Sequence, residues 1–240
     1  MDFLARAAAW FADPSHWQGG DGIPIRVLEH LALSGISLFV GVLIALPIGL
    51  YIGHTGRGAL VAVSISNIGR ALPSFGVLGM ALPLTLWLQQ QLDFRAGGVG
   101  VLPTFIALAL LAIPPVVTNA YTGLRQVDRD LVEAARGMGM TGAQLLGGVE
   151  LPLAMPIILA GLRTSAVQVV ATATLGAVLG TGGLGRYIID GLATREYERV
   201  FAGAVIVGLL SILTELAFVW LQRRTRPVVG KRREVRTAAA

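Results

Sequence analysis

The chain has 240 residues, of which 54% are hydrophobic and only 14% are charged, and its mean hydropathy is +0.71. A water-soluble domain of this length carries more charge, so most of the surface must face lipid. The sequence contains no cysteine, which excludes disulfides, thiolate metal ligands and a cysteine nucleophile. The net charge of +5 is compatible with nucleic acid, but a basic cluster directly after an apolar stretch favours anionic lipid headgroups. No nucleic-acid partner is therefore expected.

The amino-terminal segment, residues 1–30, precedes the long apolar stretches. The apolar part of residues 1–17 is short and is interrupted by Asp13 and Pro14, which argues against a secretory signal peptide. We expect a short interfacial helix here, which stays on the protein.

Five long apolar stretches follow. A bilayer core about 30 Å thick requires roughly 20 apolar residues in a helix, so the chain accommodates about five spans. Four of them are predicted at residues 31–53, 101–122, 153–179 and 200–221. The expected fold class is all-α: a polytopic membrane helix bundle at residues 31–222 with a basic tail at 223–240, the whole chain forming one transmembrane domain.

The remaining stretch, residues 58–88, is too long for one straight helix. It would measure about 46 Å at a rise of 1.5 Å per residue. Arg70, Pro73 and Ser74 mark a break, and the two halves are too short to span separately. We therefore expect one discontinuous span, whose freed backbone groups are satisfied inside the bundle.

Three ionisable residues lie within the predicted spans, where they are costly and often functional. Arg70, together with Pro73 and Ser74, is a candidate for the translocation pathway, although an ordinary structural role is equally compatible with it. Arg163 and Glu215 are better explained as an ion pair inside the bundle, or as side chains that reach the headgroups.

Basic residues in short loops predict the orientation of the chain. The tail contains Arg223, Arg224, Arg226, Lys231, Arg232, Arg233 and Arg236. The tail is therefore assigned to the cytoplasm, together with the loop at residues 125–150, and the amino terminus to the outside. The expected location is the plasma or inner membrane, crossed several times.

That cytoplasmic loop is expected to form two short helices. Asp130 followed by Glu133 fits a capping box, and so does Thr141 followed by Gln144. Gly139 between them suits the left-handed residue that ends a helix. The result is a compact helical elbow, with a face of small side chains that a partner protein can approach closely: Ala134, Ala135, Gly137 and Gly139.

The spacing of this loop resembles the EAA loop of ABC importer permeases, with valine where isoleucine is most common. The matching positions are Glu133, Ala134, Ala135, Gly139, Val149, Leu151 and Pro152. Stretches at residues 69–79 and 180–204, and the segment before the first span, resemble the osmoprotectant branch of that family. The resemblance covers about residues 15–222, and Arg70 departs from the glutamine that many relatives have.

The resemblance implies that this chain is a permease subunit and that a separate partner subunit hydrolyses ATP. The elbow would be the coupling helix that docks in a groove of an ATPase subunit. The implied partners are two ABC ATPase subunits, a second permease chain, identical or homologous, and an extracytoplasmic solute-binding protein. The implied solutes are glycine betaine, choline or carnitine, carried by alternating access.

Two alternatives remain at this point. One is a permease for another small solute, such as an amino acid, in the same superfamily. The other is an ion-coupled secondary transporter, against which stand the docking motif and the absence of a detectable inverted repeat.

Other patterns in the sequence are set aside. Gly180, Gly182 and Gly185 satisfy the dinucleotide fingerprint, but they follow a span rather than a strand. Together with Gly183 we interpret them as a flexible or re-entrant outer segment near a gate. The sequence has no phosphate-binding GxxxxGK[ST] loop, and its three histidines show no ligand spacing, so neither a cofactor nor a metal site is expected.

Overall fold

The computed structural model describes residues 3–92 and 99–224, without the side chains of Val61, Ala62, Ile65, Arg70 and Leu92. These residues form helices and no strand. In chain order the helices are α1 (Phe3–Ala12), the 3₁₀ helix η1 (Pro14–Trp17), α2 (Ile23–Thr55), α3 (Ala59–Ala71), α4 (Ser74–Leu92), α5 (Val101–Arg125), α6 (Arg129–Gly137), α7 (Gly142–Leu145), the π-helix η2 (Leu146–Glu150), α8 (Leu151–Thr172), the 3₁₀ helix η3 (Ala173–Leu179), α9 (Gly185–Thr194) and α10 (Tyr197–Arg224).

The structure confirms the predicted all-α membrane bundle. Within the described residues, 4 helical segments are long and apolar enough to cross a bilayer: Ile23–Thr55, Val101–Arg125, Gly142–Leu179 and Tyr197–Arg224. Each contains a predicted span. The first begins well before residue 31, and the segment that contains the fourth begins at Gly142, because α7, η2 and α8 run on without a break.

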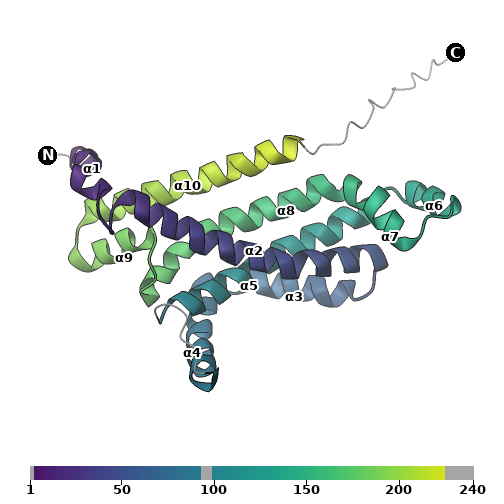
Figure 1. Ribbon diagram of the computed structural model, residues 1–240, viewed down its shortest axis with the longest axis horizontal. Helices are drawn as coiled ribbons and strands as arrows, with labels where there is room; N and C mark the ends of the chain where they lie inside the picture. Colours follow the sequence, from purple (N-terminus) through teal and green to yellow (C-terminus); the bar gives the residue numbers. More distant parts are fainter. Residues whose placement is uncertain (1–2, 93–98, 225–240) are drawn as a thin grey trace, which may run out of the picture.

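The centre of the bundle is the contact between α2, α5 and α8, which lie side by side in Figure 1. Glycines on one face of α2 allow the close approach of α5. A Cβ atom at Gly49 would lie 2.6 Å from the Cβ of Ala120, and one at Gly53 would lie 2.8 Å from the Cβ of Leu124. Such small residues let helices in lipid pack backbone to backbone.

The predicted break in the second span lies at Leu72 and Pro73, within the expected interval. Leu72 is extended, with φ −70° and ψ 132°, and proline has no N–H to continue a helix. The two halves do not continue along one axis, however. Figure 1 shows α3 beside α5, whereas α4 turns away from the bundle. The extended residue redirects the chain. Helices α3 and α4 therefore do not form the single discontinuous span that the sequence predicts.

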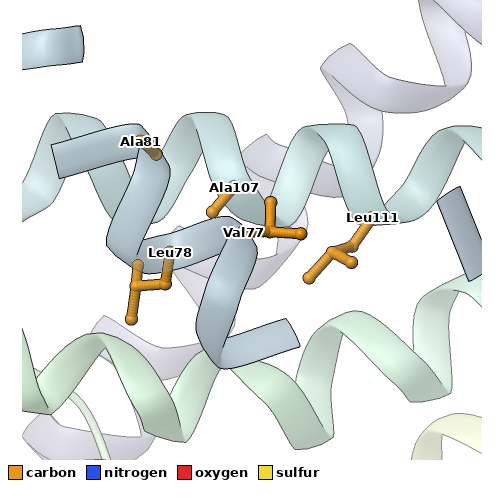
Figure 2. Packing of buried hydrophobic residues seen from close by; sticks show 5 residues of the cluster. All are labelled: Val77, Leu78, Ala81, Ala107 and Leu111. Atoms are coloured by element: carbon orange, nitrogen blue, oxygen red, sulfur yellow. The ribbon is translucent and has the colours of Figure 1, made fainter. Parts of the chain in front are cut away.

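Helix α4 is attached to the bundle through its first turns. Figure 2 shows its Val77, Leu78 and Ala81 beside Ala107 and Leu111 of α5, and these residues form one buried apolar cluster. An apolar cavity of about 370 Å³ opens between α3, α4 and α5. The contact therefore holds the start of α4 and leaves most of its length projecting.

Helices α8 and α10 are joined by the two charged residues that the sequence places inside spans. The Nε atom of Arg163 lies 3.4 Å from Oε1 of Glu215. This geometry agrees with the ion-pair interpretation, because pairing lowers the cost of placing charges within the bundle.

The glycine contact between α2 and α5 is testable by substitution. We expect Gly49→Ala to destabilise the protein by about 1–3 kcal/mol, because the added methyl group overpacks against Ala120. Gly35→Ala is the matched control on the same helix, because a Cβ atom there has nothing within 4 Å. Thermal unfolding of both variants in detergent measures the difference, and equal melting temperatures would contradict this account of the packing.

Candidate functional site

The candidate site is the elbow formed by α6, α7 and η2, which lies at the opposite end of the bundle from α1 and α9 (Figure 1). Helix α6 begins with a cap that differs from the predicted one. The Asp128 side chain accepts a hydrogen bond from the Asp130 backbone N–H at 3.0 Å. The predicted capping box of Asp130 with Glu133 is therefore wrong, because the helix begins at Arg129 and Asp130 already lies in its first turn.

The turn between the two short helices follows the prediction. Gly139 has φ +86°, and its N–H donates to the Arg136 carbonyl at 2.9 Å. The Thr141 N–H donates to Gln144 Oε1 at 2.8 Å and the Gln144 N–H donates to Thr141 Oγ1 at 3.4 Å, which is the predicted capping box. The local sequence alone therefore specifies the bend of the elbow.

The seven residues of the predicted coupling motif do not all share one surface. Glu133, Ala134, Gly139 and Pro152 are exposed, whereas Val149 and Leu151 are half-buried. Ala135 is only 3% exposed, so it does not belong to the small-residue face on which it was placed. Ala135 lies three residues after Val132, which packs on a buried apolar cluster, so the two share one side of α6.

The exposed side of the elbow carries two apolar residues that the sequence interpretation missed. Leu131 is 50% exposed and Met138 is 78% exposed. With Ala134 they follow the spacing i, i+3, i+7, which places them on one side of a helical turn. We name Leu131, Ala134 and Met138 the elbow stripe. The helical spacing was the signal that could have identified it.

Behind α6 lies a polar cleft of about 260 Å³. Its lining residues come from the ends of α2 and α5 and from the elbow: Gly53, His54, Leu124, Arg125, Val127, Arg129, Val132, Glu133, Arg136 and Glu150. At its edge Nδ1 of His54 lies 2.5 Å from Oε2 of Glu150. This pair was missed, because His54 and Glu150 lie far apart in the sequence and no spacing rule connects them.

At the other end of the bundle, the Gly180–Gly185 region forms a packed turn between η3 and α9. Gly180 and Gly183 have φ +82° and +87°, values that favour glycine. The Gly183 N–H donates to Glu29 Oε2 at 2.7 Å, and the same carboxylate fills the position of a Cβ atom at Gly182. These glycines fit closely against α2, and the interpretation of the segment as flexible or re-entrant stays a prediction.

Two further contacts hold this turn. The buried His30 of α2 makes a hydrogen bond from Nε2 to the Val170 carbonyl of α8 at 2.8 Å. The Tyr187 hydroxyl donates to the Asp21 carbonyl at 2.6 Å, and burial raises the pKa of this phenol, so it remains a donor. Sequence reasoning identified neither contact.

The residues of the predicted pathway lie at the α3–α4 break. Pro73 is exposed and Ser74 is half-buried, and Ser74 borders a small void beside Thr104 and Gly176. The Arg70 side chain lies outside the described residues. Among the residues that the structure describes, no cluster of three histidines or carboxylates could hold a metal ion.

The structure thus combines a bundle of spanning helices with an exposed helical elbow at one end. The chain belongs to the family described as "Binding-protein-dependent transport system inner membrane component", which matches residues 38–227. It is therefore a multi-pass membrane protein and a transport component of that family.

Similar proteins include permeases from Bacillus subtilis and Listeria monocytogenes. The chain is 36% identical over 208 residues to the B. subtilis choline transport system permease protein OpuBB, covering 87% of this chain and 90% of that protein. It is 33% identical over 210 residues to the carnitine transport permease protein OpuCB of L. monocytogenes, covering 88% and 91%. Among solved structures, an inward-facing MetNI methionine ABC transporter matches with a TM-score of 0.69 and 26% identity, over 83% of this chain and 94% of that chain.

The left-handed conformation of Gly139 makes a prediction for the elbow. We expect Gly139→Ala to destabilise it by about 1–2 kcal/mol, because a Cβ atom is strained at φ +86°. Gly137→Ala is the control, since neither glycine has an atom within 4 Å of its Cβ position and only Gly139 has a positive φ. Hydrogen exchange of the Met140 amide, which donates to the Ala135 carbonyl, reports the opening of this turn. Equal protection in both variants would contradict the prediction.

Proposed function

We propose that this chain is the membrane-spanning permease of an ATP-driven importer for a small compatible solute such as glycine betaine, choline or carnitine. The names of the similar proteins support this class of solute. The observation that carries the proposal is the elbow, which combines the spacing of the coupling motif with an exposed apolar stripe. An apolar stripe with a polar surround is a surface suited to a partner protein.

The partner at the elbow is proposed to be an ABC ATPase, with one subunit for each of two permease chains. Glu133, Ala134, Ala135, Gly139, Val149, Leu151 and Pro152 carry the coupling role, Ala135 from the buried side. ATP hydrolysis belongs to that partner. The second permease completes the pathway, and an extracytoplasmic solute-binding protein delivers the solute.

The proposed orientation places the elbow and the carboxyl end of α10 in the cytoplasm. Gln222 donates from Nε2 to the Pro156 carbonyl at 2.8 Å, so the end of α10 lies beside the start of α8. Arg223 and Arg224 follow directly, which gathers basic residues on the elbow side. Helix α1 then lies on the outer side, packed against the start of α10.

The proposed pathway runs beside the α3–α4 break, with Arg70, Pro73 and Ser74 as candidate lining residues. The turn at Gly180, Gly182, Gly183 and Gly185 is the candidate outer gate. Ser74 and Gly176 border the same void, and η3 leads from Gly176 directly into this turn. A movement of the turn at Gly180–Gly185 would therefore be transmitted to the break between α3 and α4.

A permease for another solute, such as an amino acid, is the second candidate. Its support is the likeness to the methionine transporter and to an amino acid ABC transporter, the latter at a TM-score of 0.69 and 23% identity, which concerns the fold alone. Identification of the binding protein that copurifies with the importer, and of its ligand, separates the two candidates.

Copurification tests the assignment of the elbow. We expect the native chain to retain an ATPase subunit in detergent, and the double variant Glu133→Ala/Gly139→Ala to lose it. Glu198→Ala at the opposite end of the bundle is the control and should retain it, since Glu198 pairs with Arg6 on the other side. If the native chain retains no ATPase, the importer proposal fails. Uptake driven by a proton gradient without ATP would then support an ion-coupled secondary transporter.

Substitution tests the pathway residue. We expect Arg70→Gln to change the rate of solute uptake by several-fold while ATPase copurification stays the same, because a charge near the pathway alters solute binding. Uptake into proteoliposomes at equal protein content is the measurement. Unchanged uptake would remove Arg70 from the pathway.

A further inference from the structure

The contact between His54 and Glu150 joins two parts of the chain that the coupling motif does not connect. His54 lies in the last turn of α2, and Glu150 is the last residue of the π-helix η2. Nδ1 of His54 lies 2.5 Å from Oε2 of Glu150. The other ring nitrogen, Nε2, lies 3.3 Å from the Cβ position at Gly142, where α7 begins. The imidazole is therefore placed between both short segments of the elbow.

Glu150 depends on this contact. Its side chain is only 7% exposed, and a buried carboxylate without a partner is strongly unfavourable. Within residues 3–92 and 99–224 this is the one hydrogen bond or ion pair between α2 and the elbow. The elbow also packs on α8, with which it is continuous, and its Val132 and Leu146 pack on an apolar cluster that includes Ala120 and Leu124 of α5.

We propose that the His54–Glu150 contact fastens the elbow to α2, so that displacement of the elbow by an ATPase moves the first span together with the fourth. His54 and Glu150 are then positioning residues for transport. This inference rests on the proposed function, because the ATPase must act on the elbow. It adds a polar connection from the elbow to α2, besides the continuity of the elbow with α5 and α8.

The structure of α2 explains how such a displacement would reach the outer side. Its 33 residues measure about 50 Å at 1.5 Å per residue, and it is packed along α5 through glycine contacts. Near its outer end, Glu29 accepts from Gly183 and His30 bonds to Val170. The helix thus carries a polar contact to the elbow at one end and to the candidate outer gate at the other.

The surroundings of the pair lower the cost of removing one partner. The His54 side chain is 20% exposed, at the edge of the polar cleft lined by Arg125, Arg129, Glu133 and Arg136. Water from this cleft can solvate the site after truncation, so no dry core cavity is created. A change in transport can therefore be separated from a failure to fold.

The test uses the whole importer, reconstituted in proteoliposomes with its ATPase and binding protein. We expect His54→Ala to lower solute uptake per ATP hydrolysed by about tenfold, within the usual range of coupling between distant sites. The amount of ATPase subunit that copurifies should not change. His54→Asn keeps an N–H donor near the Nδ1 position and should recover most of the uptake. Gly147→Ala is the control within η2, because a Cβ atom there has nothing within 4 Å.

Combining the substitutions separates coupling from independent damage. If the contact acts as one unit, His54→Ala/Glu150→Ala lowers uptake per ATP no further than either single change. Unchanged uptake per ATP in His54→Ala overturns the proposal, and so does a loss that only follows a reduced amount of assembled complex. Absence of an ATPase from the native preparation is a different result, which refutes the proposed function itself.

Discussion

Helix α2 must approach α5 closely, and the arrangement of the bundle depends on this approach. In lipid, helices gain little from burying apolar side chains against each other, so backbone proximity and van der Waals packing carry the association. Gly41, Gly49 and Gly53 provide it, because a Cβ atom at any of them would collide with α5. Helix α5 then receives α8 on another side and the start of α4 on a third.

Polar contacts between helices lie at several levels of the bundle. His54 with Glu150 and Glu29 with Gly183 lie toward opposite ends of α2, and Arg163 with Glu215 joins α8 to α10 between those levels. Each places a charged or polar group opposite a partner, because a charged or polar group without a partner is costly inside the bundle. Between them the buried residues include small polar side chains, among them Ser34, Ser37 and Ser165, of which Ser165 donates to the Ala112 carbonyl of α5.

The elbow combines local specification with tertiary anchoring. Its bend is produced by Gly139 and by the cap at Thr141, both of which act within a few residues. It is attached to α5, which precedes α6 by three residues, to α8, into which η2 continues, and to α2 through Glu150. A π-helix often marks a functional position in a helix, and here it presents Glu150 to His54. The elbow is therefore free on its stripe side and held on the other.

The sequence by itself determined the class of the protein, the approximate spans, the break at Pro73, the turn at Gly139 and the capping box at Thr141. These features follow from hydropathy, proline geometry and hydrogen bonds between residues close in the chain. Short-range rules failed at Asp130, where the helix began at a neighbouring residue, and at Ala135, whose direction depends on what α6 packs against. Only the tertiary structure decided the turn of α4 away from the bundle, the fit of Gly182 and Gly183 against Glu29, and the pairing of His54 with Glu150. These contacts join residues distant in the sequence, so they depend on how the helices pack, which no local pattern records.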